Sequence, residues 1–323
     1  MLLFALVGST MAKDHYVPQC YLRNFKTEPG RIWCYEVGRY TCLMGIKKAA
    51  SRLDYYTLKK EIHGIDSTTL DDLYKNIETH SSPIIQRLIV MEELDLSDDD
   101  RSMMALFVAS LANRTPAFED NQARMYEEIL NHFNRMVTSN KDRFLAVASQ
   151  AGIDVGNEDP EELEKTRLEL MGGIKLDRER FKGPLQRTSV DIVFDGLAEL
   201  LFHKEWHILH SDSSRVFITS DDPVVLLPPK DHHPADGLGF LAASILLTLS
   251  PKRALLLRNE PVQQRIIKIN RDKVDFYNRA IMWHADKQMY SNLKSVDFEK
   301  AFIELQKNKE RQKAARKGVT ARE

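Results

Sequence analysis

The chain has 323 residues, of which 43% are hydrophobic and 29% charged, as in an ordinary globular protein, and its formal net charge is −1. This composition excludes wholesale disorder and a fibrous architecture, and the near-neutral charge provides no overall attraction to nucleic acid or anionic membranes. Cys20, Cys34 and Cys42 form no CxxC pair, which argues against a disulfide framework or a structural zinc site and favours a reducing, cytoplasmic compartment.

The N-terminal segment is apolar but short. Residues 1–10 cannot span a bilayer, and no basic residue precedes them as in a signal peptide. Met11 begins a polar stretch that is typical of a true start. We therefore interpret residues 1–10 as an upstream extension without a role in folding, with a weak export signal as the alternative, and we expect no membrane partner.

The next segments predict a small N-terminal β-element. In HYVPQCYLRNF (residues 15–25), Pro18 suits the first turn of a short helix that ends near Phe25. RIWCYEV (residues 31–37) is rich in aromatic and β-branched residues and predicts a strand, and RLDYYTL (residues 52–58) is its expected partner.

The middle of the chain predicts a large helical core. Residues 67–90 carry one apolar stripe at helical spacing, and Ser97 is placed to cap a helix whose sequence MMALFVASLA is apolar nearly all round. Thr115 and Pro116 begin another helix, whose apolar residues we expect to face inward: Phe118, Met125, Ile129, Phe133 and Met136. Asp159 caps a further helix inside an acidic stretch, residues 152–165, that is the best candidate for an internal linker. A last long helix is expected to begin near Pro184.

The C-terminal part predicts an antiparallel sheet. After Lys204, short apolar runs alternate with turns, as in hairpins. Asn270 is expected to cap a helix through Ala280, and IMWHA is expected to return to the sheet. Residues 307–323 hold seven basic residues and almost nothing apolar, which is typical of a solvated helix end or a mobile tail. The fold class is thus α+β, with residues 11–306 as a single domain.

Common catalytic motifs are missing from the sequence, including the P-loop, GxGxxG after a strand, HExxH and GxSxG. His203, His207 and His210 are spaced like metal ligands only if a helix continues through them, and the strand-like residues around Trp206 argue against this. We interpret these histidines as surface or hydrogen-bonded core residues.

Three polar clusters lie at stiff backbone junctions: His15 before Pro18, Arg114 before Thr115-Pro116, and Asp221 in TSDDP. A structural role explains each one separately, because Pro18 sets a helix entry, a cation suits a helix C-terminus, and TSDDP can form a turn between strands.

Together these motifs resemble a bacterial family called domain of unknown function 4238. The similarity follows HYVPQCYLRNF, the helix with Glu78, LANRTP, VFITSDDPVVL and LSPKRALLL in that order, from residue 15 to about residue 290. The chain departs from the family pattern at Cys20, where an aromatic residue is commoner, and at Asp222, where asparagine often occurs. The resemblance implies that these motifs occur together, and it carries no established activity.

Two function hypotheses follow. In the first, His15, Glu78, Arg114 and Asp221 form one catalytic site of a hydrolase for a phosphate-containing substrate, such as a nuclease-like effector, with a proton-shuttling histidine, an anion-binding arginine and an acid as base or metal ligand. A divalent metal cofactor stays open, and the basic tail could hold nucleic acid. In the second, the protein is a ligand-sensing or protein-interaction module without enzymatic activity, and the same residues are structural.

Overall fold

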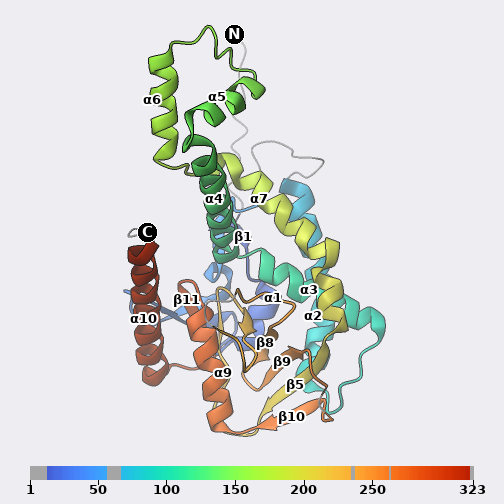
Figure 1. Cartoon of the computed structure of the whole chain (residues 1–323). Coiled ribbons are helices and arrows are strands. Elements are labelled where there is room, and N and C mark those ends of the chain that lie inside the picture. Colours follow the sequence, from blue (N-terminus) through green and yellow to red (C-terminus); the bar gives the residue numbers. More distant parts are fainter. Residues whose placement is uncertain (1–12, 57–66, 234–236, 262, 321–323) are drawn as a thin grey trace, which may run out of the picture. The chain divides into compact units, whose positions relative to one another are not determined.

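The computed structural model describes residues 13–56, 67–233, 237–261 and 263–320 (Figure 1). The predicted upstream extension, residues 1–10, lies outside the described residues. The chain divides into two compact units, here called the first unit (residues 1–116 and 187–323) and the second unit (residues 117–186). Its helices and sheets make it an α+β protein, as the sequence predicts.

The first unit begins with a short strand and a short helix. Strand β1 (Lys13–His15) is followed by α1 (Gln19–Leu22), whose N-cap is Pro18, and by a 3-10 turn η1 (Arg23–Phe25). The expected helix entry at Pro18 and the end at Phe25 are confirmed. β1 pairs with β4 (Ser51–Leu53), which follows the turn η2 (Ile46–Lys48).

A four-stranded sheet collects segments from both ends of the chain in the order β3-β2-β11-β6. The expected strand β2 (Arg31–Glu36) pairs with β3 (Cys42–Gly45) and with β11 (Gln288–Ser291), and β11 also pairs with β6 (Thr219–Ser220). The prediction that residues 52–58 pair with β2 was wrong. The connection after β2 turns back at once, so β3 reaches the free edge first, and residues 51–53 lie against β1 instead.

The second sheet has five strands in the order β10-β5-β9-β8-β7. They are β5 (Glu205–Ser211), β7 (Val224–Leu227), β8 (Ser244–Ser250), β9 (Arg253–Arg258) and β10 (Ile266–Ile269). The predicted antiparallel hairpins are present, but β10 runs parallel to β5, which makes the sheet mixed. β8 and β9 are almost fully buried and consist of continuous apolar runs, as expected for strands covered on both faces.

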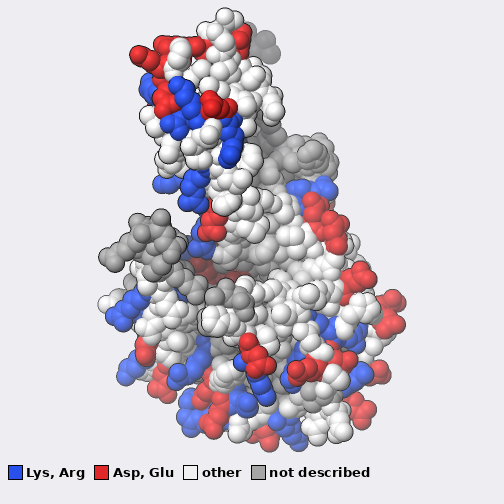
Figure 2. Space-filling view, viewed as in Figure 1, with Lys and Arg blue, Asp and Glu red and all other residues white. Residues whose placement is uncertain are grey.

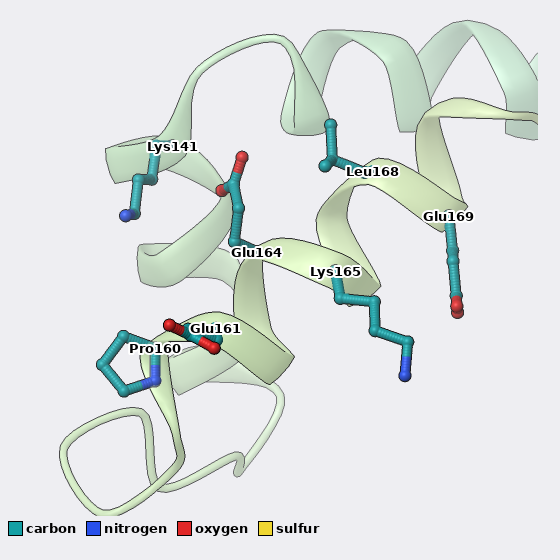
Figure 3. Close-up of a pocket in the computed structure, with 7 residues that line it drawn as sticks. All are labelled: Lys141, Pro160, Glu161, Glu164, Lys165, Leu168 and Glu169. Atoms are coloured by element: carbon teal, nitrogen blue, oxygen red, sulfur yellow. The ribbon is translucent and has the colours of Figure 1, made fainter.

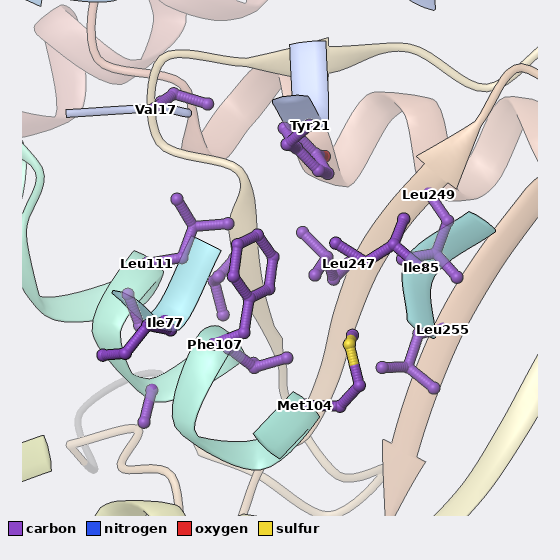
Figure 4. Packing of buried hydrophobic residues seen from close by; sticks show 14 of the residues in the cluster. Val17, Tyr21, Ile77, Ile85, Met104, Phe107, Leu111, Leu247, Leu249 and Leu255 are labelled. Atoms are coloured by element: carbon purple, nitrogen blue, oxygen red, sulfur yellow. The ribbon is translucent and has the colours of Figure 1, made fainter. Parts of the chain in front are cut away.

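Two helices pack on this sheet and form the main core. α2 (Ser67–Val90) runs beside α3 (Asp98–Asn113), whose N-cap Ser97 accepts a hydrogen bond from the backbone N–H of Asp100. Residues 104–113 of α3 are all buried except the half-buried Leu106, so the predicted central helix is confirmed. Figure 4 shows apolar side chains of α2 and α3 meeting those of the sheet and of the N-terminal segment: Ile77, Ile85, Met104, Phe107, Leu111, Leu247, Leu249, Leu255, Val17 and Tyr21.

Further helical elements complete the first unit. The last part of α7 (Arg178–Ile192) continues into a π-helical turn (Val193–Leu197), where Gly196 has φ 156°, and into α8 (Ala198–His203). α9 (Arg271–His284) is capped by Asn270, and α10 (Val296–Thr320) packs on α9 (Figure 1). α7 begins six residues before the expected Pro184, and α9 extends to His284, so the prediction that IMWHA is a strand was wrong. The apolar residues Ile281 and Met282 are buried from within the helix.

The second unit holds most of α4 (Pro116–Thr138), then α5 (Lys141–Gln150), α6 (Pro160–Met171) and the start of α7. Asn140 and the predicted Asp159 cap α5 and α6. The expectation that the apolar stripe of α4 faces inward was wrong for four residues, because Met125, Ile129, Phe133 and Met136 are exposed. Periodicity identifies the apolar stripe of a helix, but it does not show that another element covers the stripe. No helix in the described ranges is long and apolar enough to cross a membrane.

Candidate functional site

Arg114 and Glu78 form a partly buried ion pair. Arg114 directly follows the last residue of α3, and its Nη1 donates to Glu78 Oε1 on α2 at 2.9 Å. The Arg114 side chain is only 1% exposed, whereas that of Glu78 is 26% exposed. The guanidinium carbon also lies 4.9 Å from the ring centre of Tyr74, one helical turn before Glu78. The arginine is therefore held by a carboxylate and an aromatic face of the same helix.

The remaining polar edge of Arg114 has no partner. Its Nε and Nη2 are buried, and neither donates a hydrogen bond to any described residue. Desolvation lowers the pKa of Arg114, but Glu78, Tyr56 and Tyr74 outweigh it, so the pKa is raised and the group is a cation. Nε and Nη2 form the side-on fork with which arginine binds two oxygens of one anion.

His15 lies within the electrostatic influence of Glu78. Burial lowers the pKa of His15, while the charge of Glu78 and a backbone hydrogen bond at Lys47 raise it in part. Its Nε2 is buried and has no hydrogen-bond partner in the described chain, and its Nδ1 lies 3.5 Å from Gln19 Nε2. The imidazole is thus neutral near pH 7 with one ring nitrogen unused.

Cys20 lies in the same electrostatic environment, but it is not an activated nucleophile. Burial raises the pKa of its thiol to about 11, with Glu78 adding to the rise and Arg114 opposing it. A thiol with this pKa stays protonated at neutral pH and is a poor nucleophile.

Asp221 is fully occupied by backbone donors. Its Oδ1 accepts from the N–H of Asp286, and its Oδ2 accepts from the N–H groups of Lys287 and Gln288, each at 2.9 Å. Burial raises the pKa of Asp221 to about 7, Asp286 and Asp222 add to the rise, and the backbone donors oppose it. The carboxyl group joins the turn after β6 to the loop that leads from α9 into β11.

The neighbouring Asp222 contacts both Thr115, the residue after Arg114, and His284. Thr115 Oγ1 donates to Asp222 Oδ1 at 3.1 Å, and Asp222 Oδ2 lies 3.2 Å from His284 Nε2 at the end of α9. The Asp222 side chain is 10% exposed and that of His284 is 32% exposed. A mostly buried carboxylate therefore orients an imidazole that water can reach, as in many general-base pairs.

Tyr21 connects three of the motifs noted in the sequence. Its hydroxyl donates to the Thr248 carbonyl at 2.6 Å and shares a hydrogen bond with Thr219 Oγ1 at 2.8 Å. Thr219 begins the TSDDP turn, and Thr248 immediately precedes the LSPKR turn. Folding thus brings HYVPQCYLRNF, VFITSDDPVVL and the start of LSPKRALLL together in the core of the first unit.

The four residues singled out in the sequence fall into two places. Glu78 and Arg114 touch, and His15 is close enough to feel the charge of Glu78. Asp221 points its carboxyl group at residues 286–288 and reaches Arg114 only indirectly, because the next residue, Asp222, binds Thr115.

Sequence reasoning missed Tyr74, and it missed the pair of Asp222 and His284. The position of Tyr74 four residues before Glu78 on one helix was a usable signal. His284 had none, because its segment was expected to form a strand.

The Lys and Arg side chains are interspersed with Asp and Glu over the described part of the face in Figure 2. A shallow depression in the second unit is lined by charged residues of α6 and by Lys141 (Figure 3). The hydrogen bond from Arg167 lowers the pKa of Glu164 in this depression, and the charge of Lys141 adds to the effect. The described residues contain no group of three or more His, Cys, Asp or Glu side chains placed to hold a metal ion.

Comparison with known proteins identifies a family. The model of the family described as protein of unknown function (DUF4238) matches residues 13–295. No curated protein and no solved structure matches the chain.

Proposed function

The chain belongs to the DUF4238 family, and we propose that it is a hydrolase of a phosphate-containing substrate that binds the phosphate at Arg114. One observation carries the proposal: Arg114 uses only Nη1 on Glu78 and keeps Nε and Nη2 unpaired. A buried donor without an acceptor costs about 1–3 kcal/mol, so a protein that keeps two on one side chain has a use for them. Two oxygens of a phosphate group satisfy both donors at once.

His15 supplies the base in this proposal. Because burial lowers its pKa, the neutral imidazole of His15 can accept a proton at neutral pH. Water forms a new bond to phosphorus, the bond to the leaving oxygen breaks, and the proton taken from water returns to that oxygen. Glu78 fixes the orientation of the guanidinium and adds negative charge that favours the protonated imidazole.

Asp222 and His284 form a second proton-transfer pair beside the same junction. His284 is the more exposed partner, and Asp222 fixes the direction of its ring. Asp221 acts through this pair rather than on the substrate, because it binds the N–H of Asp286, two residues after His284. We therefore assign Asp221 a positioning role. The basic end of the chain makes a nucleic-acid substrate the first to test.

The test compares the buried Arg114 with the partly buried Arg101. Arg101 has the same pair of donors, Nε and Nη2, but in Arg101 both already donate to carbonyl groups, those of Phe202 and Lys204. We expect Arg114→Lys to weaken binding of inorganic phosphate about 10- to 100-fold, which corresponds to one bidentate charged interaction of about 1.5–3 kcal/mol. Arg101→Lys should leave phosphate affinity unchanged. Calorimetric titration measures both, and equal affinities for wild type and Arg114→Lys contradict the proposal.

Turnover separates catalysis from sensing. We expect the wild type to hydrolyse a chromogenic phosphodiester or a single-stranded oligonucleotide, and we expect His15→Gln to lose this activity while keeping phosphate affinity.

The second candidate function is a phosphate-sensing module without chemistry. It is favoured by the full occupation of Asp221 with backbone donors. Phosphate binding at Arg114 without hydrolysis of either substrate supports this module over the hydrolase.

A further inference from the structure

The second unit contains an apolar cleft that is separate from the site at Arg114. Its volume is about 720 Å³, and it lies between α4, α5 and α6. Pockets for small molecules commonly measure about 300–1,000 Å³ and have mostly apolar walls. The walls here come from all three helices, including Leu130, Phe133, Val137, Phe144, Val147 and Leu163.

Several of these wall residues are not covered by the protein itself. Phe133 is 59% exposed, Ile153 is 44% exposed and Leu130 is 37% exposed. Singly exposed apolar side chains are normal, but three that line one concavity form a contiguous apolar surface of the kind that marks binding sites. A ligand with an apolar body would remove this surface from water.

The ionisable residues that line the cleft are all acidic. Its only ionisable lining residues are Glu158 and Glu162, and no lysine or arginine lines it. Lys165 lies 3.6 Å from Glu162, but both side chains are about two-thirds exposed, so this ion pair is weak. Arg167, the next basic residue on α6, is engaged by Glu164, and its Nη1 also donates to the carbonyl of Thr138. The ionisable groups that line the cleft would therefore attract a cation.

We propose that this cleft binds a small lipophilic organic cation, with its apolar body against Phe133 and Phe144 and its positive centre facing Glu158 and Glu162. The inference does not depend on the function proposed for Arg114, because every residue that lines the cleft lies in the second unit. The failure of either proposal leaves the other intact.

Two probes of equal shape and opposite charge test the proposal on the full chain. We expect tetraphenylphosphonium to bind at least tenfold more tightly than tetraphenylborate in a calorimetric titration. The double variant Glu158→Gln and Glu162→Gln should lose this preference for the cation. An equal affinity for the two probes in the wild type, or no binding of the cation, overturns the proposal.

A second set of variants locates the binding. Ala151 is exposed and lines the cleft, so Ala151→Trp should fill it and abolish binding of the cation. The matched control is Leu168→Trp, because Leu168 is exposed on α6 but lines the shallow depression of Figure 3 instead. If Ala151→Trp does not fold, Thr166→Trp serves the same purpose, since Thr166 is also exposed and lines the cleft.

Competing occupants give different results. If the wild type sediments as a dimer and Ala151→Trp as a monomer, the cleft holds a second copy of the chain and the proposal is wrong. Undiminished binding of the cation to folded Ala151→Trp also overturns it.

Discussion

The replacement Asp221→Asn should change how stability depends on pH. The pKa of Asp221 is raised from 3.8 to about 7 in the folded protein. A carboxyl group with a raised pKa stabilises the fold below its unfolded pKa, and this contribution is lost as the pH rises through the folded value. The shift of about 3 units corresponds to roughly 4 kcal/mol, lost mainly between pH 4 and pH 7.

Asparagine removes this titration but cannot replace every hydrogen bond. Its oxygen can accept from Lys287 and Gln288, as Oδ2 of Asp221 does, but its amide nitrogen then faces the N–H of Asp286. One buried donor without an acceptor costs about 1–3 kcal/mol. We therefore expect the variant to be less stable than the wild type near pH 4 and more stable near pH 8, with the two curves crossing in between.

Urea unfolding at half-unit pH steps measures the crossing, because the difference between variant and wild type cancels the titration of all other groups. The control is Asp286→Asn, since the charge of Asp286 contributes to the raised pKa of Asp221. This variant should move the loss of stability to lower pH without abolishing it. A constant difference between wild type and Asp221→Asn from pH 4 to pH 8 would refute the reasoning, because it would mean that the three backbone donors keep Asp221 ionised throughout.

Two further changes test the core. Ala109→Asp places an unpaired carboxylate at a completely buried position of α3, so we expect the free energy of unfolding to fall by more than about 4 kcal/mol, or no soluble protein. The control Ser102→Asp, on the exposed side of the same helix, should fold normally, and near-equal melting temperatures of the two variants would contradict this prediction. Tyr21→Phe removes the hydroxyl that bonds to Thr219 and Thr248, and we expect chemical denaturation to show a cost of about 1–3 kcal/mol; an unchanged midpoint would mean that this link between motifs contributes nothing.

Local signals in the sequence determined most of the helices. Ser97 and Asp159 cap α3 and α6 as expected, because the hydrogen bond of an N-cap joins a side-chain oxygen to a backbone N–H only two or three residues later in the chain. The apolar sequence of α3 likewise identified the centre of the core, since a helix without a polar face is stable only when it is surrounded. The helix that contains Glu78 and the end of α3 before Arg114 were also predicted correctly, because they too depend on local patterns in the sequence.

Strand partners and covered faces depend on long-range contacts. β2 pairs with β3 and with β11, about 250 residues later, and no local pattern distinguishes these partners from residues 52–58. The stripe of α4 has the spacing of a buried face, yet Met125, Ile129, Phe133 and Met136 are exposed. In both cases the decisive energy comes from segments far away in the chain.

The same division holds for the site. The sequence by itself identified His15, Arg114 and Asp221 as polar residues at stiff junctions, because proline and helix ends restrict the backbone locally, and the family resemblance added Glu78. Only the tertiary structure decided their partners: Glu78 pairs with Arg114, while Asp221 binds the backbone of residues 286–288. It also joined Asp222 to His284, a pair that sequence spacing could not reveal. A hydrogen bond requires donor and acceptor within about 3 Å, and for residues this far apart in the chain only the packing of whole elements sets that distance.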